Sequence, residues 1–423
     1  MKRILIILLS LVTLTLSAQT VPDNELSRSI REFPQRAGNN LHSFEFLPLH
    51  DTPAPKGYKP FYISHYGRHG SRTSSEGKIY DRVEKALSKA LADGMLTPDG
   101  EVLLDATRRV VKGYDGMSGR LTPRGRREHA AIAERMYHRY SSVFKKGSKK
   151  IFAASSTVPR CIISMTAFTN RLMMLQRDLD IDIDTGENFM KYISQADTKE
   201  LRESTAPVLD ALYKDFIPDT TVILQTLFKN PASARQYLYS NSSYRLEKDI
   251  FRIAQATEAL DVEENLFRLL PEDAVYYWAE RYSMYIYLHH ANSALNGDVR
   301  IPRASLLMDD IITRADEVIA GAPRAADLRF GHDWPFVSLA CYLGLEGISR
   351  RMTTEEARGN WPAALYTPLA ANLQMIFYRN KHQDILVKFL LNEKETLISG
   401  LAPVQGPYYR WEDVKHYVRE EWN

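Results

Sequence analysis

A histidine flanked by arginines lies early in the chain, in the segment Arg68-His69-Gly70-Ser71-Arg72. The planar guanidinium group of arginine matches the oxygens of a phosphate and keeps its charge. A histidine that is neutral at one nitrogen can attack an electrophile and form a covalent intermediate. The glycine permits close approach of the backbone. The segment is therefore a candidate phosphate-binding loop with His69 as nucleophile, and the alternative is a solvated basic turn.

A second polar cluster, Ser155-Ser156-Thr157-Val158-Pro159-Arg160, supplies a third arginine. It stands between a predicted strand and a predicted helix, and the free N–H groups and positive dipole end of a helix N-terminus favour anions. Arg160 is therefore a candidate phosphate ligand. The alternative is an ordinary helix cap in which Arg160 pairs with a surface carboxylate.

A third cluster, Gly331-His332-Asp333, adds a second imidazole and a carboxyl group. Cleavage of a phosphomonoester requires a proton for the departing alcohol oxygen, and a carboxylic acid can supply it. Nearby arginines lower the pKa of such a carboxyl, whereas a bound phosphate partly cancels their field. Asp333 is therefore a candidate general acid at acidic pH. The alternative is a simple turn after a strand.

Each cluster follows a short β-prone run, at 61–64, 151–155 and 327–330. In open α/β sheets, ligand sites gather at the carboxyl ends of the strands. We therefore expect the three clusters to meet in one pocket.

Helical spacing of apolar residues predicts helices over 78–92 and about 159–175. Another helix is expected to begin at Thr122, a suitable N-cap, with Pro123 in the first helical position. Long amphipathic stretches dominate from about 197 to 296, whereas further strand candidates lie at 374–379 and 385–390, and a last helix is expected near Trp411.

These patterns predict an α/β fold with a mainly parallel sheet flanked by helices and a largely helical second domain. Residues 41–196 are expected to form the first part of the α/β core, 197–300 the helical domain or insertion, and 301–423 the second part of the core. The polar stretch 21–40 reads as an extended lead-in.

The composition indicates a globular protein with a charge close to balance. Of 423 residues, 44% are hydrophobic and 25% charged, and the formal net charge is +3. We predict no nucleic-acid partner, because such proteins carry strong basic patches.

The first 18 residues are typical of a cleavable secretory signal. Lys2 and Arg3 precede the apolar run Ile4 to Leu16, and Ser17-Ala18 supplies small residues at the expected cleavage site after Ala18. We expect a periplasmic or extracellular protein without stable membrane association once the signal is removed. The apolar run is short for a transmembrane helix, and the alternative is an uncleaved anchor.

Only two cysteines occur, Cys161 and Cys341, each in a stretch typical of a buried helix. They can form one disulfide or remain two inert core thiols. No third ligand lies nearby in sequence, so no metal site is predicted.

Together, Arg68-His69-Gly70-Ser71-Arg72, Arg160 and His332-Asp333 resemble the motifs of the histidine acid phosphatase family, in the clade with phytases and multiple inositol polyphosphate phosphatase. The segment Leu121-Thr122-Pro123-Arg124-Gly125 resembles the Leu-Thr-x-x-Gly segment of that family. The resemblance covers nearly the whole mature chain in order and spacing.

The resemblance implies that His69 is the phosphate-accepting nucleophile and Asp333 the proton donor. It also implies a phosphate pocket made by Arg68, Arg72, Arg160 and His332. Water would hydrolyse the phosphohistidine, no metal or organic cofactor would be needed, and the helical domain would roof the cleft.

The chain departs from the family pattern at two points. Ser74 stands where the family often has proline, and His332-Asp333-Trp334 stands where many relatives of multiple inositol polyphosphate phosphatase carry His-Ala-Glu. We expect a small phosphorylated substrate, with inositol polyphosphates such as phytate as candidates. The alternatives are an inactive phosphate-binding protein of the same fold and a phosphate-transfer mutase. The expected export argues against a mutase function, and the presence of both His69 and Asp333 argues against an inactive protein.

Overall fold

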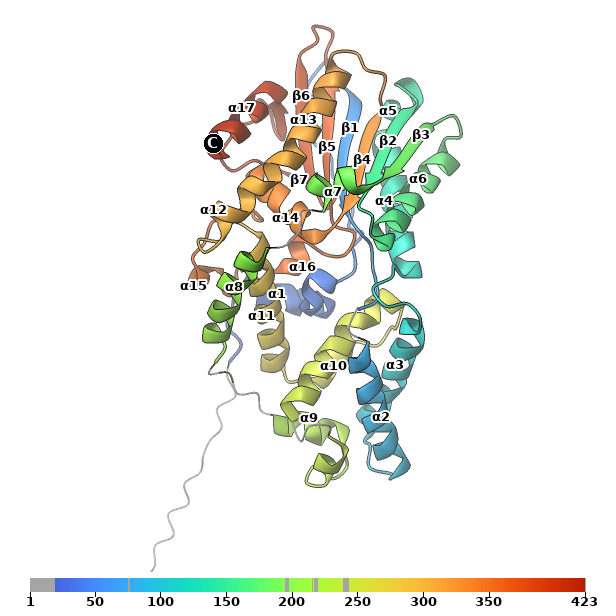
Figure 1. Ribbon diagram of the computed structural model, residues 1–423, viewed down its shortest axis with the longest axis vertical. Coiled ribbons are helices and arrows are strands. Elements are labelled where there is room, and N and C mark those ends of the chain that lie inside the picture. The colour runs from blue at the N-terminus through green and yellow to red at the C-terminus, as the bar shows by residue number, and fades with distance from the viewer. Residues whose placement is uncertain are drawn as a thin grey trace, which may run out of the picture.

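The computed structural model describes residues 20–74, 77–194, 198–214, 216, 220–238 and 243–422. A central sheet carries the strands in the order β3–β2–β4–β1–β5–β6–β7, and β8 pairs with β6 (Figure 1). The strands are β1 Lys59–Arg68, β2 Lys150–Ser155, β3 Asp180–Thr185, β4 Ala326–Gly331, β5 Asn372–Arg379, β6 Ile385–Leu391, β7 Lys394–Thr396 and β8 Tyr408–Arg410. Strands β1 to β4 pair in parallel, and the remaining pairs are antiparallel. The predicted α/β fold is confirmed.

The three strands that end in polar clusters lie together in the middle of the sheet. Strand β4 pairs in parallel with β1 on one side and with β2 on the other. All six residues of β4 are buried, as expected of a parallel strand covered on both faces. Strand β1 is longer than the predicted run 61–64, because β4 and β5 pair with it from both sides over most of its length.

Helices cover one face of the sheet in a single layer. These are α4 Pro123–Arg139, α5 Ser141–Lys146 and α6 Pro159–Leu175. Their apolar side chains, among them Met136 and Phe168, pack in one cluster with Ile63, Leu328 and Phe330 of the central strands. Helices α4 and α6 of this layer extend beyond the carboxyl ends of the strands, where the polar clusters lie.

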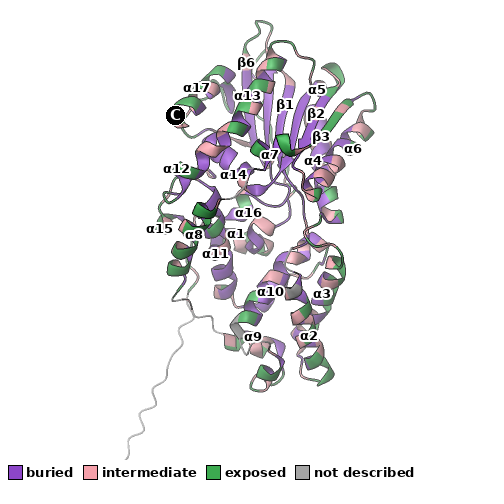
Figure 2. Cartoon of the chain, viewed as in Figure 1, coloured by how far each residue is buried: buried purple, intermediate pink, exposed green. Residues whose placement is uncertain are grey.

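The opposite face is covered by helices from the later part of the chain and by one short helix that follows β3. These are α7 Glu187–Ile193, α13 Ser305–Ile319, α14 Asp333–Tyr342 and α17 Trp411–Trp422 (Figure 1). Tyr62, Tyr66 and Phe377 alternate with the residues of the first face and pack toward this layer, as side chains of a strand must. Figure 2 shows the sheet buried between the two layers, with exposed residues on the outer sides of the helices.

A second group of helices packs together at the end of the molecule away from the sheet. It contains α2 Lys78–Ala92, α3 Pro98–Tyr114, α9 Thr220–Leu227 and α10 Ser243–Thr257 (Figure 1). Helices α2 and α3 come from the range 41–196 that we assigned to the core. Helical structure at this end therefore draws on both parts of the chain, and the predicted domain limits stay predictions.

Shorter elements and two longer helices connect the two groups. The longer helices are α8 Lys199–Leu212 and α11 Glu272–His290. The shorter ones are α1 Glu25–Glu32, α12 Gly297–Arg300, α15 Thr354–Ala357 and α16 Ala363–Tyr366, with the 3₁₀ turns η1 Pro34–Leu41, η2 Ala234–Tyr237, η4 Glu258–Leu260, η5 Leu266–Leu269 and η6 Ile301–Ala304.

Local sequence signals located several helices correctly. Helix α2 spans 78–92 and α6 spans 159–175, as predicted. Thr122 caps α4 by accepting a hydrogen bond from the amide of Gly125, and Pro123 occupies the first turn. The expected extended lead-in at 21–40 is wrong. It contains α1 and η1, and α1 begins with a capping box between Asn24 and Ser27 that the polar composition concealed.

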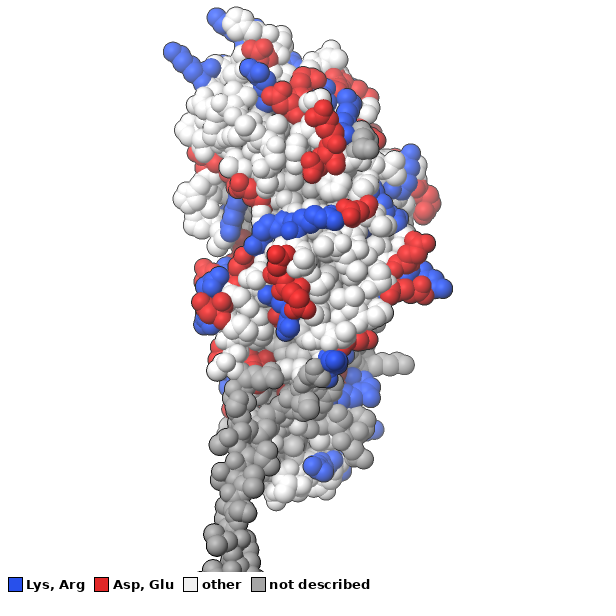
Figure 3. All heavy atoms as spheres, turned by 90° about the vertical axis from the view of Figure 1, so that its left-hand side faces the viewer, with Lys and Arg blue, Asp and Glu red and all other residues white. Residues whose placement is uncertain are grey.

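The surface carries charges of both signs. On the face shown in Figure 3, Lys and Arg side chains are interspersed with Asp and Glu. In the described part of the chain, no helix combines the length and apolar character needed to cross a membrane. The predicted signal, residues 1–18, lies outside the described residues.

Candidate active site

The register of the sheet brings the three polar clusters to one edge. Arg68 at the end of β1 lies opposite Gly331, and Ser155 at the end of β2 lies opposite Phe330. The amide of His69 donates to the carbonyl of Gly331 at 2.9 Å. All six predicted site residues are thus gathered around the carboxyl ends of β1, β2 and β4.

The start of α4 holds the loop that follows β1. The amide and hydroxyl of Ser71 both donate to the carboxylate of Glu128, at 2.7 and 2.6 Å. The carbonyl of Ser71 accepts the amide and hydroxyl of Thr122, at 2.9 and 3.0 Å. A Cβ on Gly125 would lie 2.3 Å from that same carbonyl, so only glycine allows this approach. The segment 121–125 therefore supports the loop that carries His69.

The ring of His69 is neutral and has a defined tautomer. Its Nδ1 lies 3.0 Å from the carbonyl of Gly70, and a carbonyl can only accept, so Nδ1 carries the proton and Nε2 the lone pair. Burial, then the charges of Arg68 and Arg160, lower the pKa of His69 well below its ordinary value. The imidazole therefore stays unprotonated in mildly acidic solution.

Three guanidinium groups surround this imidazole: Arg68 is buried, and Arg72 and Arg160 are half-buried. Arg68 donates through Nη1 to the carbonyls of Asn40 and Thr367, at 2.5 and 2.8 Å. Burial and the neighbouring arginines lower the pKa of Arg72 to about 10, which leaves it charged at neutral and acidic pH. Among the described residues, the buried Nε of Arg68, Arg72 and Arg160 has no hydrogen-bond partner. Spare N–H donors and mutual repulsion both favour an anion between them.

His332 closes the pocket opposite His69. The two rings lie 5.8 Å apart in an edge-on arrangement, and the ring of His332 stacks on Trp334 at 4.7 Å. Arg160 lies 3.5 Å from Nδ1 of His332, and Ser156 Oγ lies 3.2 Å from Nε2. Burial and Arg160 lower the pKa of His332 to about 3, so this ring is neutral as well.

Asp333 is an ionised carboxylate in the site as it stands. Its Oδ2 accepts from Arg68 Nη2 and from Asn40 Nδ2, both at 2.9 Å, and its Oδ1 accepts the amide of Trp334 at 3.2 Å. Burial acts to raise the pKa of Asp333, but the charges of Arg68 and His290 outweigh burial and hold it well below its usual range.

The geometry adds residues that the sequence patterns did not indicate. Tyr66 accepts the amide of His332 at 3.2 Å and donates to the carbonyl of Ile193 at 2.8 Å. Ser164 on α6 accepts the amide of Gly70 at 3.1 Å. These residues act across elements that are distant in sequence, so no local motif marks them.

His65, four residues before His69, lies outside the pocket. Its ring packs on the face of the sheet that α6 covers, against Phe168 and Phe330, with ring centroids 5.1 and 5.4 Å apart. Burial lowers the pKa of His65 to about 3. The one-residue alternation of a strand directs His65 toward α6, whereas the loop after the strand turns His69 into the pocket.

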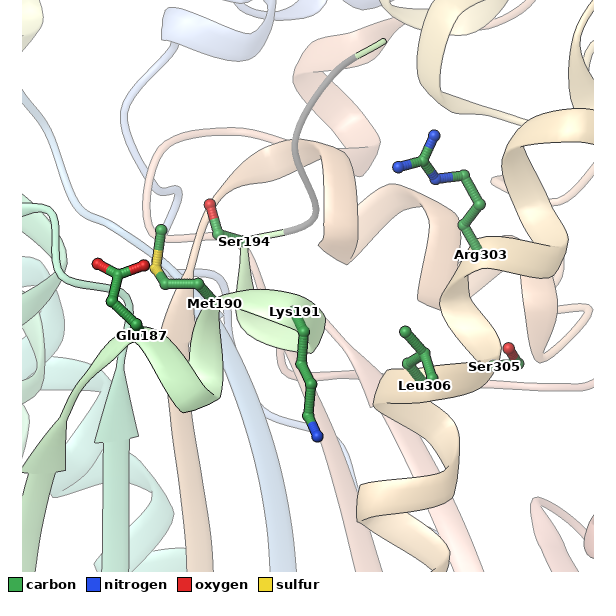
Figure 4. A pocket seen from close by; sticks show the side chains of 7 residues that line it. All are labelled: Glu187, Met190, Lys191, Ser194, Arg303, Ser305 and Leu306. Carbon is green, nitrogen blue, oxygen red and sulfur yellow. The ribbon is translucent and has the colours of Figure 1, made fainter.

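A cavity of about 600 Å³ adjoins the pocket, between α7 and the η6–α13 junction (Figure 4). It is lined by Glu187, Met190, Lys191, Ser194, Arg303, Ser305 and Leu306. Lys191 and Arg303 project from opposite walls in Figure 4. Met190 Sδ lies 3.4 Å from the amide of Thr157, and the carbonyl of Ser194 accepts the indole N–H of Trp334. One wall thus contacts the two clusters that hold Arg160 and His332.

Neither cysteine forms a disulfide. Cys161 and Cys341 are buried and free, and burial raises the pKa of Cys161 to about 11. The structure therefore favours core thiols over a disulfide. Within the described ranges, no group of three His, Cys, Asp or Glu side chains is placed to hold a metal ion.

Known proteins resemble this chain over most of its length. A sequence model of the histidine phosphatase superfamily (branch 2) matches residues 67–392. Multiple inositol polyphosphate phosphatase 1 of Gallus gallus is 22% identical over 404 residues, which cover 86% of this chain and 83% of the relative.

Solved structures share the fold at low sequence identity. Bifidobacterium longum multiple inositol polyphosphate phosphatase in complex with phosphate has a TM-score of 0.74 at 18% identity, and the match covers 92% of this chain and 98% of the other. The same enzyme in complex with inositol hexasulfate has a TM-score of 0.71 with the same identity and coverage. The phytase from D. castellii has a TM-score of 0.68 at 13% identity, with 91% and 84% covered.

Proposed function

The chain belongs to branch 2 of the histidine phosphatase superfamily, and on that premise we propose that it hydrolyses organic phosphomonoesters through a phosphohistidine on His69. The observation that carries this proposal is the state of His69. Its Nε2 holds a lone pair, its ring is neutral, and it is surrounded by three arginines, each with a buried Nε that has no hydrogen-bond partner among the described residues.

The first step transfers the phosphoryl group to the enzyme. Nε2 of His69 attacks phosphorus, and the bond from phosphorus to the alcohol oxygen breaks. Protonated Asp333 gives its proton to that oxygen, so the alcohol leaves neutral. Arg68, Arg72 and Arg160 are charged donors for the phosphoryl oxygens, whose charge they stabilise through the transition state.

The second step restores the enzyme. A water molecule attacks the phosphorus of phosphohistidine, its proton passes to the carboxylate of Asp333, and the bond from phosphorus to Nε2 breaks. Phosphate leaves, and His69 is again neutral with Asp333 protonated. The two steps together consume one phosphomonoester and one water and yield one alcohol and one phosphate.

Asp333 must gain a proton before the first step. In the structure it is ionised, because Arg68 contacts Oδ2 at 2.9 Å. An entering phosphate brings up to two negative charges among the same arginines and weakens the field that keeps Asp333 ionised. Binding of substrate therefore favours the protonated carboxyl, and activity is expected on the acidic side of neutrality.

Inositol polyphosphates such as phytate are the substrate class that the proposal favours. Proteins named multiple inositol polyphosphate phosphatase and phytase are similar to this chain in sequence or fold. The cavity beside the pocket carries Lys191 and Arg303, which suit further phosphate groups of one substrate.

The experiment measures phosphate release from p-nitrophenyl phosphate and from phytate between pH 4 and 7. The His69→Ala variant is expected to lose activity on both, and His138→Ala, at an exposed histidine of α4, serves as the matched control. Full activity of His69→Ala would refute the assignment. Phosphate binding without release by the unaltered protein would instead indicate an inactive phosphate-binding protein. Ranking phytate, sugar phosphates and bisphosphoglycerate by kcat/KM then identifies the preferred substrate.

The cellular location is a separate part of the proposal. The lysine, arginine and apolar run at the N-terminus support export with cleavage after Ala18. N-terminal sequencing of the protein from the periplasm or medium is expected to begin at Gln19, and recovery of the intact N-terminus in the cytoplasm would contradict export.

A further inference from the structure

The 3₁₀ turn η1, before β1, brings one side chain into contact with the proposed proton donor. Asn40, in this turn, donates through Nδ2 to Oδ2 of Asp333 at 2.9 Å. The carbonyl of the same residue accepts Nη1 of Arg68 at 2.5 Å. Asn40 lies outside residues 67–392, the part of the chain that the family model matches. It therefore joins two site residues from a segment that no motif includes.

We propose that Asn40 is a positioning residue that orients the carboxyl group of Asp333 and stabilises its charged form. The inference rests on the proposed function, because it assigns Asn40 a part in the proton transfer from Asp333. It goes beyond that function in making the segment before β1 a component of the active site.

The chain on both sides of Asn40 is held in place, which fixes the backbone from which its side chain reaches Asp333. The preceding residue, Asn39, is fully buried, and its φ of 58° and ψ of −130° mark a sharp turn of the backbone just before Asn40. Asn39 accepts the hydroxyl of Ser283 on α11 at 2.6 Å. On the other side, the carbonyl of His42 accepts the amide of Leu369 at 2.8 Å. A side chain that starts from a fixed backbone loses less entropy when it makes a hydrogen bond than one on a mobile segment.

Asp333 is also surrounded by ionisable groups from other elements. They are Arg68 and Tyr66 of β1, Arg72 in the loop after β1, Arg160 and Cys161 of α6, His290 of α11, and the adjacent His332. Oδ2 of Asp333 accepts hydrogen bonds from two side chains, Arg68 and Asn40. The Asn40 amide is the neutral one, so its removal leaves the charges of the site unchanged. A substitution at Asn40 can therefore test the hydrogen bond alone.

The direction of the effect follows from the hydrogen bond. A donor to a carboxylate favours the charged form, so loss of the donor raises the pKa of the acid. Asp333 then stays protonated to higher pH, and the alkaline limb of the kcat profile moves upward. A hydrogen bond to a charged group contributes about 1.5 kcal/mol or more, which corresponds to a shift of about one pH unit.

The test compares two substitutions and two substrates. For Asn40→Ala, the alkaline limb of kcat on phytate or an alkyl phosphate is expected about one unit higher. Asn40→Asp places a second carboxyl beside Asp333, and because two carboxyls then share a proton, a larger upward shift is expected. With p-nitrophenyl phosphate the leaving group needs no proton, so the limb is expected to move little in either variant.

Two controls separate this role from general damage. Glu32→Gln changes the charge of an exposed residue eight positions before Asn40, with no contact to Asp333, and is expected to leave the profile unchanged. In the Asp333→Asn background, adding Asn40→Ala is expected to have no further effect on kcat, since the group that it acts on is gone.

The inference is overturned if, with alkyl phosphates, the alkaline limb of the kcat profile lies at the same pH in both Asn40 variants as in the wild type. It is also overturned if they lose activity equally on both substrates at every pH, because that result indicates a structural role. Failure of the proposed function has a different signature, which is activity in His69→Ala or inactivity of the unaltered protein.

Discussion

Replacement of Gly125 by alanine tests whether the start of α4 positions the loop that carries His69. An alanine Cβ at this position would lie 2.3 Å from the carbonyl oxygen of Ser71 and 2.8 Å from its amide nitrogen. Ordinary contacts between carbon and oxygen are roughly 3.3 Å or longer, so the loop must retreat by about 1 Å. Displacement of reacting groups by about 1 Å can reduce the rate by roughly 100-fold. We expect kcat/KM of Gly125→Ala to fall by about that factor.

The stability of this variant is expected to change much less than its activity. Alanine favours a helix over glycine by about 1 kcal/mol, whereas overpacking costs about 1 to 3 kcal/mol, so the two effects partly cancel. Measuring thermal unfolding together with the kinetics separates the effect on stability from the effect on activity. Gly38→Ala is the matched control, because the nearest atom to its added Cβ is 3.7 Å away, an ordinary contact.

A particular result would refute this reasoning. If Gly125→Ala folds with a wild-type melting temperature and keeps kcat/KM within about threefold, the close approach of α4 to Ser71 does not position the loop that carries His69. The hydrogen bonds from Ser71 to Glu128 and from Thr122 to Ser71 would then be structural features without consequence for the reaction.

Three further outcomes are expected. Arg68 contacts two carbonyls and Asp333 at once, and a lysine ammonium cannot reproduce this forked geometry. Arg68→Lys is therefore expected to lower kcat/KM by about 100-fold or more, while an unchanged Tm shows that the fold survives. Burial lowers the pKa of His42, but hydrogen bonds to Glu258 and Glu45 prevail and raise it to about 9. Protonated His42 therefore stabilises the folded state by roughly 3 kcal/mol, and this stabilisation is complete below about pH 6.5 and lost as the pH rises through 9. The Tm of the wild type should fall over that pH range, whereas the Tm of His42→Gln should not. Cys161 and Cys341 are expected to react with a thiol reagent only after denaturation, and rapid labelling of the native protein would contradict their burial.

Local sequence patterns were sufficient where structure depends on neighbouring residues. The limits of α2 and α6 follow from apolar spacing and turn-forming ends, and the start of α4 follows from Thr122 and Pro123. The residue types of the three clusters also indicated phosphate chemistry, because arginine, histidine and a carboxyl group have properties that do not depend on the fold. Their position after strands was enough to predict that they converge.

Patterns failed where an element is stabilised by distant contacts. Strand β3 is an exposed edge strand that exists because β2 pairs with it, and its sequence, Asp180 to Thr185, alternates acidic residues with isoleucine. The turn η1 is polar in sequence, yet its residues 36–39 are buried against other elements. The alternation in β3 is too short and too exposed to distinguish a strand from a polar loop, and η1 has no apolar periodicity because its burial comes from the rest of the chain.

The sequence alone determined the chemical groups of this protein and the strands that carry them. Only the tertiary structure decided their states. Burial among arginines makes His69 neutral, the carbonyl of Gly70 selects the nitrogen that carries its proton, and contact with Arg68 and Asn40 keeps Asp333 ionised. The physical reason is that ionisation and hydrogen bonding depend on distances of about 3 Å between groups hundreds of residues apart, and the packing of the whole chain sets those distances.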